Sequence, residues 1–246
     1  MKTLFSILAL IFVSSSFASE IPNPLRIATE GAYPPFNTTD ANGQLTGFDV
    51  DIANALCKQM KANCIIVAQD WDGIIPTLIA NKYDAIIASM SITAERKKTI
   101  DFTNKYYSNY LTLISRQSGG VRGPDNLQGK VVGAQRATLA AQWAEDNLIG
   151  QADIKLYDTQ TAAYADLLSG RLDAMVSDIW PAMDWIKDNK DFGLAGDKID
   201  VNDQIGIGIR QGQDGLKASF NRAIDAIRAN GTYARINAKY FSTDIY

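Results

Sequence analysis

The residues most able to do chemistry gather in the segment 87–96, IASMSITAER. An apolar run at 84–88, which we expect to form a buried strand, leads into a polar turn that opens a helix. The side chains of this turn and of the first helical turn that can donate hydrogen bonds are Ser89, Ser91, Thr93 and Arg96. Main-chain N–H groups at a helix start, hydroxyl groups and a guanidinium all donate hydrogen bonds to anions. The segment therefore predicts a receptor for a carboxylate.

Three other residues complete a hypothesis about the ligand. Asp178 ends a predicted strand at 172–177 and can accept hydrogen bonds from an ammonium group. Tyr33 and Trp71 follow predicted strands, and their flat faces suit an aliphatic chain or a cation. Together with the carboxylate receptor, these residues indicate a site for a free amino acid. The alternatives are a surface arginine at 96, an N-cap at 178 and two core aromatic residues.

The positions of these residues imply an α/β protein in two parts. Apolar runs alternate with helical patterns twice along the chain, and a turn-rich stretch at 117–129 separates the two series. The second series is shorter, so we expect the chain to cross between the parts near 109–115 and to return near 204–210. Ligands of such folds bind where the strands end, here in a cleft between two lobes.

Composition excludes several classes of function. The chain has 246 residues, a formal net charge of −3 and no histidine. Without histidine there is no Ser-His-Asp or Cys-His machinery and no His-ligated zinc. The sequence contains no basic stripe, which argues against nucleic acid as a partner. No phosphate-binding or dinucleotide-binding glycine motif is complete, so we expect no cofactor.

The N-terminus and the two cysteines indicate an oxidising compartment. Lys2, an apolar run at 4–13 and the small-residue stretch at 14–18 are typical of a secretory leader, which we expect to be cleaved after Ala18. An uncleaved anchor is the alternative. Because no cysteine follows that position directly, we expect no lipid anchor. Cys57 and Cys64 are expected to form a disulfide, with a metal site as the weaker alternative.

The chain resembles the periplasmic amino-acid-binding proteins of bacterial ABC importers, in the branch that binds lysine, arginine, ornithine and histidine. The resemblance covers the whole chain after the leader. It is carried by segments 29–36 (TEGAYPPF), 47–51 (GFDVD), 70–76 (DWDGIIP), 84–96, 171–174 (RLDA) with Asp178, and 231–233 (GTY). It implies a type II two-lobed fold that closes on its ligand, with lobe 1 formed by 19–112 and 209–246 and lobe 2 by 113–208. The Cys57–Cys64 bridge also matches this branch.

The resemblance assigns roles to individual residues. It implies that Arg96 and Ser91 bind the α-carboxylate, that Asp178 and Ser89 bind the α-ammonium, and that Tyr33 and Trp71 enclose the side chain. Thr138 is expected to donate from lobe 2. Glu30 stands where the family has an acid for cationic side chains, and Asp49 is expected to contribute to the same specificity. Glu30 as a solvated loop acid and Asp49 as a favourable charge at a helix start are the alternatives.

Two departures from the family affect the expected ligand. Ala88 replaces a serine, which removes a hydroxyl near the side-chain pocket, and residues 136–139 (RATL) replace a Gly-Ser/Thr-Thr sequence. A carboxylate at Glu30 can accept two parallel hydrogen bonds from one guanidinium. We therefore expect arginine to bind more tightly than lysine, ornithine or histidine. The implied partner is an inner-membrane ABC permease, and we expect a monomer. An enzyme on the same scaffold, similar to cyclohexadienyl dehydratase, is the alternative.

Overall fold

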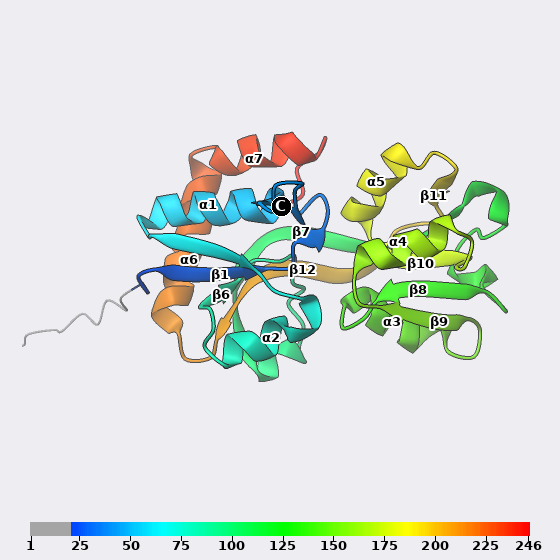
Figure 1. Ribbon diagram of the computed structural model, residues 1–246, viewed down its shortest axis with the longest axis horizontal. Coiled ribbons are helices and arrows are strands. Elements are labelled where there is room, and N and C mark those ends of the chain that lie inside the picture. Colours follow the sequence, from blue (N-terminus) through cyan, green and yellow to red (C-terminus); the bar gives the residue numbers. More distant parts are fainter. Residues whose placement is uncertain (1–20) are drawn as a thin grey trace, which may run out of the picture.

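The computed structural model describes residues 21–246, which form two α/β lobes joined by two long strands (Figure 1). Lobe 1 contains both the N-terminal and the C-terminal parts of the described chain, and lobe 2 contains the middle. This is the two-lobed arrangement predicted from the sequence. The leader predicted at 1–18 lies outside the described residues.

Lobe 1 is built on parallel strands with helices on both faces. β1 (Leu25–Thr29) pairs with β5 (Cys64–Ala68) on one side and with β6 (Ala85–Ile86) on the other. The other elements of the lobe are α1 (Phe48–Met60), α2 (Trp71–Ile79), the 3₁₀ turn η1 (Arg96–Lys98), α6 (Asp214–Ala229), α7 (Thr232–Tyr240) and a small sheet of β2 (Ala32–Tyr33), β3 (Asn37–Thr39) and β4 (Leu45–Thr46). Alternate residues of β1 pack against α1, α6 and α7 on one face and against α2 on the other, as strand geometry requires.

Lobe 2 repeats the alternation of strands and helices. Its parallel strands are β9, β8 and β10, and Asp178 is the last residue of β10. The elements are β8 (Val131–Gln135), α3 (Leu139–Leu148), β9 (Asp153–Tyr157), α4 (Gln160–Leu168), β10 (Ala174–Asp178), α5 (Ile179–Asp188), β11 (Phe192–Leu194) and the 3₁₀ turns η2 (Gln117–Gly119) and η3 (Pro124–Asn126).

Two antiparallel strands cross between the lobes and merge their sheets. β7 (Ile100–Arg116) and β12 (Ile199–Arg210) give the order β5-β1-β6-β12-β7-β10-β8-β9, with β11 also paired to β7. Gly208 and Ile209 of β12 pair with β6 in lobe 1, whereas residues 111–115 of β7 pair with β10 in lobe 2. Both crossing strands begin earlier than predicted. The predicted lobe bounds, 112 and 209, lie at opposite ends of this crossing. The exact division of the chain into lobes stays a prediction.

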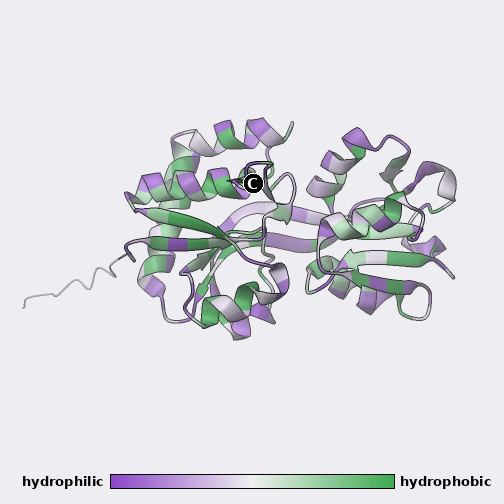
Figure 2. Ribbon diagram, viewed as in Figure 1, coloured by the Kyte–Doolittle hydropathy of each residue, from purple (hydrophilic) through white to green (hydrophobic). Residues whose placement is uncertain are grey.

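Apolar residues form separate buried clusters in the two lobes, and the helices alternate between hydrophobic and hydrophilic positions along the ribbon (Figure 2). In lobe 1 the helix α1 buries Phe48, Ile52 and Leu56, one residue for each turn, and its end is tied to β5 by the Cys57–Cys64 disulfide. This bond confirms the predicted pairing. Among residues 21–246 no cluster of three or more potential metal ligands occurs, and no helix there is long and apolar enough to cross a membrane.

The segment around Arg96 differs from the expectation. The predicted strand at 84–88 is reduced to the two residues of β6, and the predicted helix at Arg96 is a single 3₁₀ turn. The Oγ1 of Thr93 accepts a hydrogen bond from the Arg96 N–H at 3.2 Å, and Ser89 has a left-handed φ of 52°. The chain therefore turns sharply between β6 and η1, and presents a loop instead of a long helix to the cleft.

Candidate functional site

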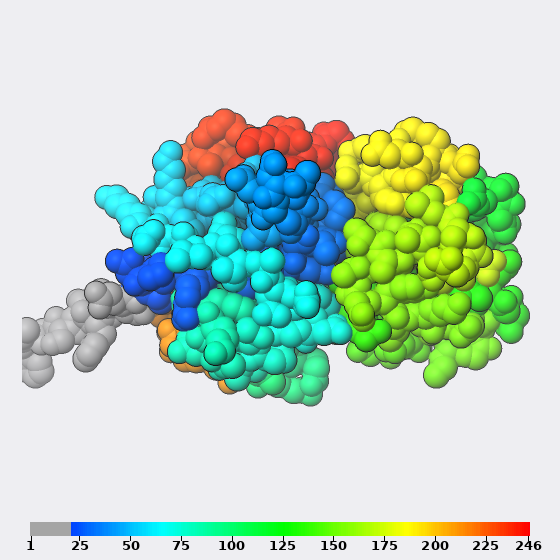
Figure 3. Space-filling model, in the orientation of Figure 1, coloured from blue at the N-terminus to red at the C-terminus, as the bar shows by residue number. Residues whose placement is uncertain are grey.

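A small cavity lies between the lobes. Its lining residues are Glu30, Tyr33, Trp71, Ala88, Ser89, Ser91 and Arg96 from lobe 1, and Gln135, Thr138, Leu139 and Asp178 from lobe 2. On the face shown in Figure 3, atoms of the two lobes meet along a closed seam. The structure brings together all the candidate ligand-binding residues except Asp49.

Arg96 lies at one end of the cavity and is held by main-chain oxygens. Its Nη1 donates to the Ser91 carbonyl at 2.8 Å, and its Nη2 donates to the Ala137 carbonyl of lobe 2 at 2.9 Å. The guanidinium carbon lies 5.3 Å from the centroid of the Trp71 ring. Burial lowers the pKa of Arg96 to about 10, so the side chain keeps its positive charge at neutral pH. These contacts fix a cation where an anionic ligand group can reach it.

Asp178 lies on the lobe 2 side of the same cavity. Its Oδ2 accepts a hydrogen bond from the Tyr33 hydroxyl of lobe 1 at 2.5 Å. It occupies the N-cap position of α5, but its side chain makes no capping hydrogen bond. Burial is the main cause that raises the pKa of Asp178 to about 7, and the negative charge of Asp203 adds to it. The carboxylate is therefore directed at the cavity and at lobe 1 instead of at its own helix.

Glu30 supplies a second acid to the wall. The residue is 8% exposed, and its Oε1 accepts a hydrogen bond from the Gln135 Nε2 of lobe 2 at 2.8 Å. Burial raises the pKa of Glu30 to about 7, since the desolvated carboxylate is less stable than the neutral acid. A cationic ligand group beside Glu30 would favour the ionised form. The solvated loop acid considered above does not describe this residue.

The two aromatic residues predicted to enclose the ligand both reach the cavity. Trp71 is the first residue of α2, and its Nε1 donates to the Ala137 carbonyl at 3.2 Å. Tyr33 is 8% exposed and ends β2. The Ala137 carbonyl thus accepts from both Trp71 and Arg96, which ties the β8–α3 turn of lobe 2 to lobe 1.

Asp49 lies behind the cavity wall. Its carboxylate accepts hydrogen bonds from Tyr106 Oη at 2.7 Å, Asn37 Nδ2 at 2.8 Å and Ser89 Oγ at 2.9 Å. Asp49 is fully buried, and burial raises its pKa to about 6. It therefore supports the turn that contains Ser89 and does not line the space where a ligand side chain would lie.

The hydroxyl groups of the site are largely engaged by the protein. Ser89 donates its Oγ hydrogen to Asp49, and its main-chain N–H donates to the Tyr106 hydroxyl at 3.0 Å. Thr138 caps α3 by accepting from the Ala141 N–H at 3.1 Å, and it donates to the Gln135 carbonyl at 2.7 Å. Both residues thus hold turns in place, and their contribution to a ligand stays a prediction.

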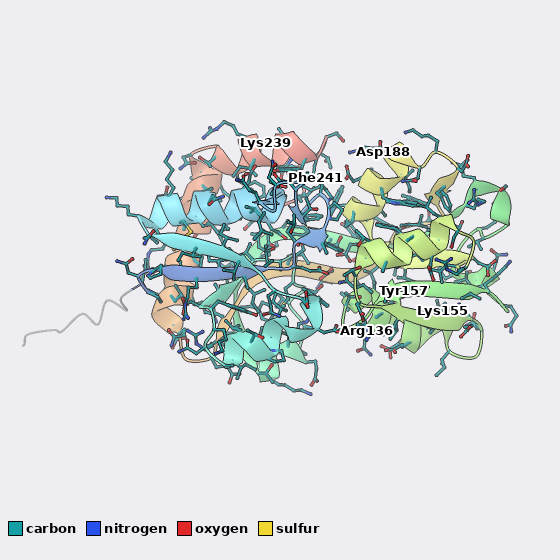
Figure 4. The ribbon with its side chains drawn as sticks, viewed as in Figure 1. Arg136, Lys155, Tyr157, Asp188, Lys239 and Phe241 are labelled. Carbon is teal, nitrogen blue, oxygen red and sulfur yellow. A yellow bond between two sulfur atoms is a disulfide. The ribbon has the colours of Figure 1, made fainter. Side chains whose placement is uncertain are left out.

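Gln135 was not among the candidates from the sequence. It is 2% exposed, and its Nε2 donates both to Glu30 and to the Asp158 carbonyl. A lone glutamine at the end of an apolar strand gives no signal that could have identified it. The next residue, Arg136, lies at the edge of lobe 2 nearest α2 (Figure 4), 3.0 Å from Asp158 and 3.9 Å from Asp72 of lobe 1. Arg136 thus forms one ion pair within lobe 2 and one with lobe 1.

Known proteins are similar to this chain over most of its length. Residues 25–243 match the family model described as bacterial extracellular solute-binding proteins, family 3. An L-arginine-binding protein of Pseudomonas aeruginosa is 42% identical over 240 residues, covering 94% of this chain and 92% of the relative. A lysine/arginine/ornithine-binding periplasmic protein of Escherichia coli K12 is 38% identical, covering 95% of this chain and 93% of the relative. An ancestral arginine-binding protein bound to arginine superposes with a TM-score of 0.86 at 32% identity, covering 91% of this chain and 100% of that structure.

Proposed function

The chain belongs to the bacterial extracellular solute-binding proteins of family 3, and we propose that it captures a free basic amino acid, preferably arginine, for an ABC permease. The relatives named above are binding proteins for arginine or for lysine, arginine and ornithine. They support a role in capture and delivery instead of in turnover.

One observation carries the choice of ligand. The wall of a single cavity contains one base, Arg96, and two acids, Asp178 and Glu30. A basic amino acid has the complementary set, which is one carboxylate, one ammonium and one cationic side chain. A neutral amino acid would leave Glu30 without a cation, and an acidic amino acid would place two negative charges together.

The shape of the side-chain end favours arginine among basic amino acids. The guanidinium is planar and donates along two parallel directions, which a carboxylate can accept as a pair. Trp71 and Tyr33 offer flat surfaces for the same plane and for the methylene chain. Ala88 on the wall supplies no hydroxyl for a compact ammonium. Lysine, ornithine and histidine are therefore expected to bind more weakly.

Closure of the lobes provides the mechanism. The cavity residues come from both lobes, so a ligand that contacts both favours the closed arrangement over the open one. The permease would then recognise the closed form. We further propose that the leader at 1–18 directs the chain to the periplasm, where it acts as a monomer without a lipid anchor.

A thermal-shift screen against the common amino acids tests the proposal. A ligand at a hundredfold excess over its dissociation constant stabilises the native state by about 2.7 kcal/mol, so arginine should give the largest shift. Glutamate and glutamine serve as controls that lack the positive charge of the arginine side chain. A larger shift with either of them would contradict the assignment. A turnover assay with prephenate-like ring acids, expected to show none, separates capture from the dehydratase alternative.

A further inference from the structure

Asp203 is a buried carboxylate on the crossing strand β12 that the binding mechanism above does not use. The residue is 5% exposed and does not line the cavity. Among residues 21–246 no lysine or arginine forms an ion pair with it. A buried charge without an ion pair is costly, so its presence in the hinge suggests a role.

Asn109, on the other crossing strand, connects Asp203 to the cavity. The two residues are opposite each other in the pairing of β7 with β12, and the Asn109 Nδ2 donates to the Asp203 Oδ2 at 2.7 Å. Asn109 is 2% exposed, and its Oδ1 is buried without a hydrogen-bond partner in the described part of the chain. Asp178 pairs with Leu111 of the same strand β7, two residues from Asn109, so the side chains of Asp178, Asn109 and Asp203 project from the same face of the sheet. Strand β7 thus connects a carboxylate of the hinge with a carboxylate of the cavity wall.

The anion-binding end of the cavity is attached to the same part of β12. Ser91 forms a β-bridge with Ile205 of β12. Beside this bridge, the Ile92 N–H donates a hydrogen bond to the Gln204 carbonyl at 2.8 Å. The Ser91 carbonyl in turn accepts from the Arg96 guanidinium. Burial raises the pKa of Asp203 and lowers that of Arg96, and the attraction between the two charges opposes both shifts. The two charged residues Arg96 and Asp178 are therefore both connected to residues 203–205 of β12.

We propose that Asp203 is a positioning residue of the amino-acid site, which holds Arg96 and Asp178 at the spacing required by an α-carboxylate and an α-ammonium. This inference rests on the proposed function, since it assigns those two groups to a ligand. Because Asp203 lies on a strand that crosses between the lobes, movement at the hinge and engagement of the two ligand groups are coupled.

The charges around Asp203 should make ligand binding depend on pH in a way that a purely structural residue would not. Arg96 approaches from η1 and Asp178 from β10, while Asn109 of β7 and Ser91 are neutral. Burial raises the pKa of Asp178 to about 7, and repulsion by the negative charge of Asp203 adds to this shift. An α-ammonium requires the ionised Asp178, so ligand binding should release protons, and acid should weaken binding.

Asp203→Asn tests this property. The variant keeps the size of the side chain and an acceptor for Asn109, but it removes the charge. Asp178 should then ionise at lower pH, so the acid loss of arginine affinity should begin at lower pH than in the unmodified protein. The difference between the two proteins should be about tenfold in dissociation constant for each unit by which the pKa of Asp178 moves. Titration calorimetry between about pH 8 and 5.5 measures it.

Glu30 also loses its charge in acid, but equally in both proteins, so the difference reports on Asp178 and Asp203. Asp200→Asn is the matched control, since Asp200 lies on the same strand and is exposed. Its profile should coincide with that of the unmodified protein. If the Asp203→Asn profile also coincided, the charge coupling would be overturned.

Asp203→Ala tests the positioning itself. It removes the acceptor of Asn109, so arginine affinity at about pH 8 should fall roughly tenfold or more, whereas Asp203→Asn should retain most of it. A folded alanine variant that binds like the unmodified protein would overturn the proposal, as would equal losses in both variants. If the alanine variant does not fold, the pH profile of Asp203→Asn decides. If the unmodified protein binds no basic amino acid, the proposed function fails first, which is a separate result.

Discussion

The two lobes hold their parts of the cavity in different ways. In lobe 1 two binding residues are held by hydrogen bonds within their own lobe, since Ser89 is bonded to Asp49 and Tyr106, and Arg96 to the Ser91 carbonyl. In lobe 2 the main contacts of the site are made with lobe 1. The Gln135 amide meets Glu30, Asp178 meets Tyr33, and the Ala137 carbonyl meets Arg96 and Trp71. These contacts require the closed arrangement.

This difference suggests a division of labour between the lobes. In lobe 1 the part of the receptor that contains Ser89 and Arg96 is preformed, and therefore this lobe should determine which ligand is recognised. Lobe 2 completes the site only when the lobes meet, so it should determine how strongly recognition is converted into closure. Substitutions in the two lobes should then give different patterns of loss.

Arg96→Ala should have the largest effect on binding, because it removes the fixed cation of the lobe 1 receptor. A desolvated carboxylate left without its partner typically costs about 3–5 kcal/mol, or roughly two to four decades in affinity. Titration calorimetry with arginine measures this loss. Lys97→Ala, at an exposed neighbouring position, is the matched control and should bind normally. A loss below about tenfold would place the carboxylate elsewhere.

Glu30→Gln should have the next largest effect and should be selective. The variant keeps the shape of the side chain but loses its charge, and a hydrogen bond to a charged group contributes about 1.5–3 kcal/mol. Arginine should therefore bind more weakly, whereas a neutral ligand such as glutamine should bind with nearly unchanged affinity. Competition binding compares the two ligands. Equal losses for both would show that Glu30 supports the lobe and does not select the side chain.

The same variant should change the pH dependence of binding. Burial raises the pKa of Glu30 to about 7, and a bound cation favours the ionised carboxylate, so the pKa should be lower in the complex. Binding then releases a proton, and arginine affinity should fall as the pH decreases below about 7. Glu30→Gln lacks this group and should show a smaller fall, with Asp178 accounting for the rest. Identical profiles for the two proteins would contradict this account.

Gln135→Leu should have a smaller effect that tests the role of lobe 2. It removes the hydrogen bond that the closed lobe 2 donates to Glu30, with an expected loss of about 1–2 kcal/mol in arginine binding. In the Glu30→Gln background the same change should cost less, because the charge-assisted bond is already absent. A double-mutant cycle measures this coupling. Additive losses would mean that Gln135 acts within lobe 2, through its bond to the Asp158 carbonyl.

The two-lobed fold was predicted from local patterns, and the family resemblance added several of the candidate residues that line the cavity. Strands such as 25–29 and 64–68 are short apolar runs, and the candidate residues lie where such runs end. Gln135 could not be predicted in this way. Its contact with Glu30 joins positions 105 residues apart and exists only when two lobes meet.

Asp49 shows a second limit of prediction from sequence. Its place at the start of α1 was recognised, but the sequence does not tell which neighbours surround a side chain in the first turn of a helix. In the structure Asn37, Ser89 and Tyr106 surround the carboxylate, so it supports the site from behind. The two-residue strands β2, β4 and β6 were missed or overextended because such short elements have no periodicity.

Removal of the disulfide should have the smallest effect on binding, although it should lower stability. Cys64 begins β5 opposite Leu25 at the start of β1, whereas Glu30 and Trp71 follow the other ends of these strands. The bridge thus lies at the end of the sheet remote from the cavity. Replacing both cysteines by serine should lower the free energy of unfolding by about 2–3 kcal/mol, since the bridge closes a short loop. Arginine affinity below the melting transition should stay within about twofold, and denaturant titration and calorimetry measure the two quantities. A loss of affinity without a loss of stability would show that the receptor in lobe 1 is less rigid than its hydrogen bonds indicate.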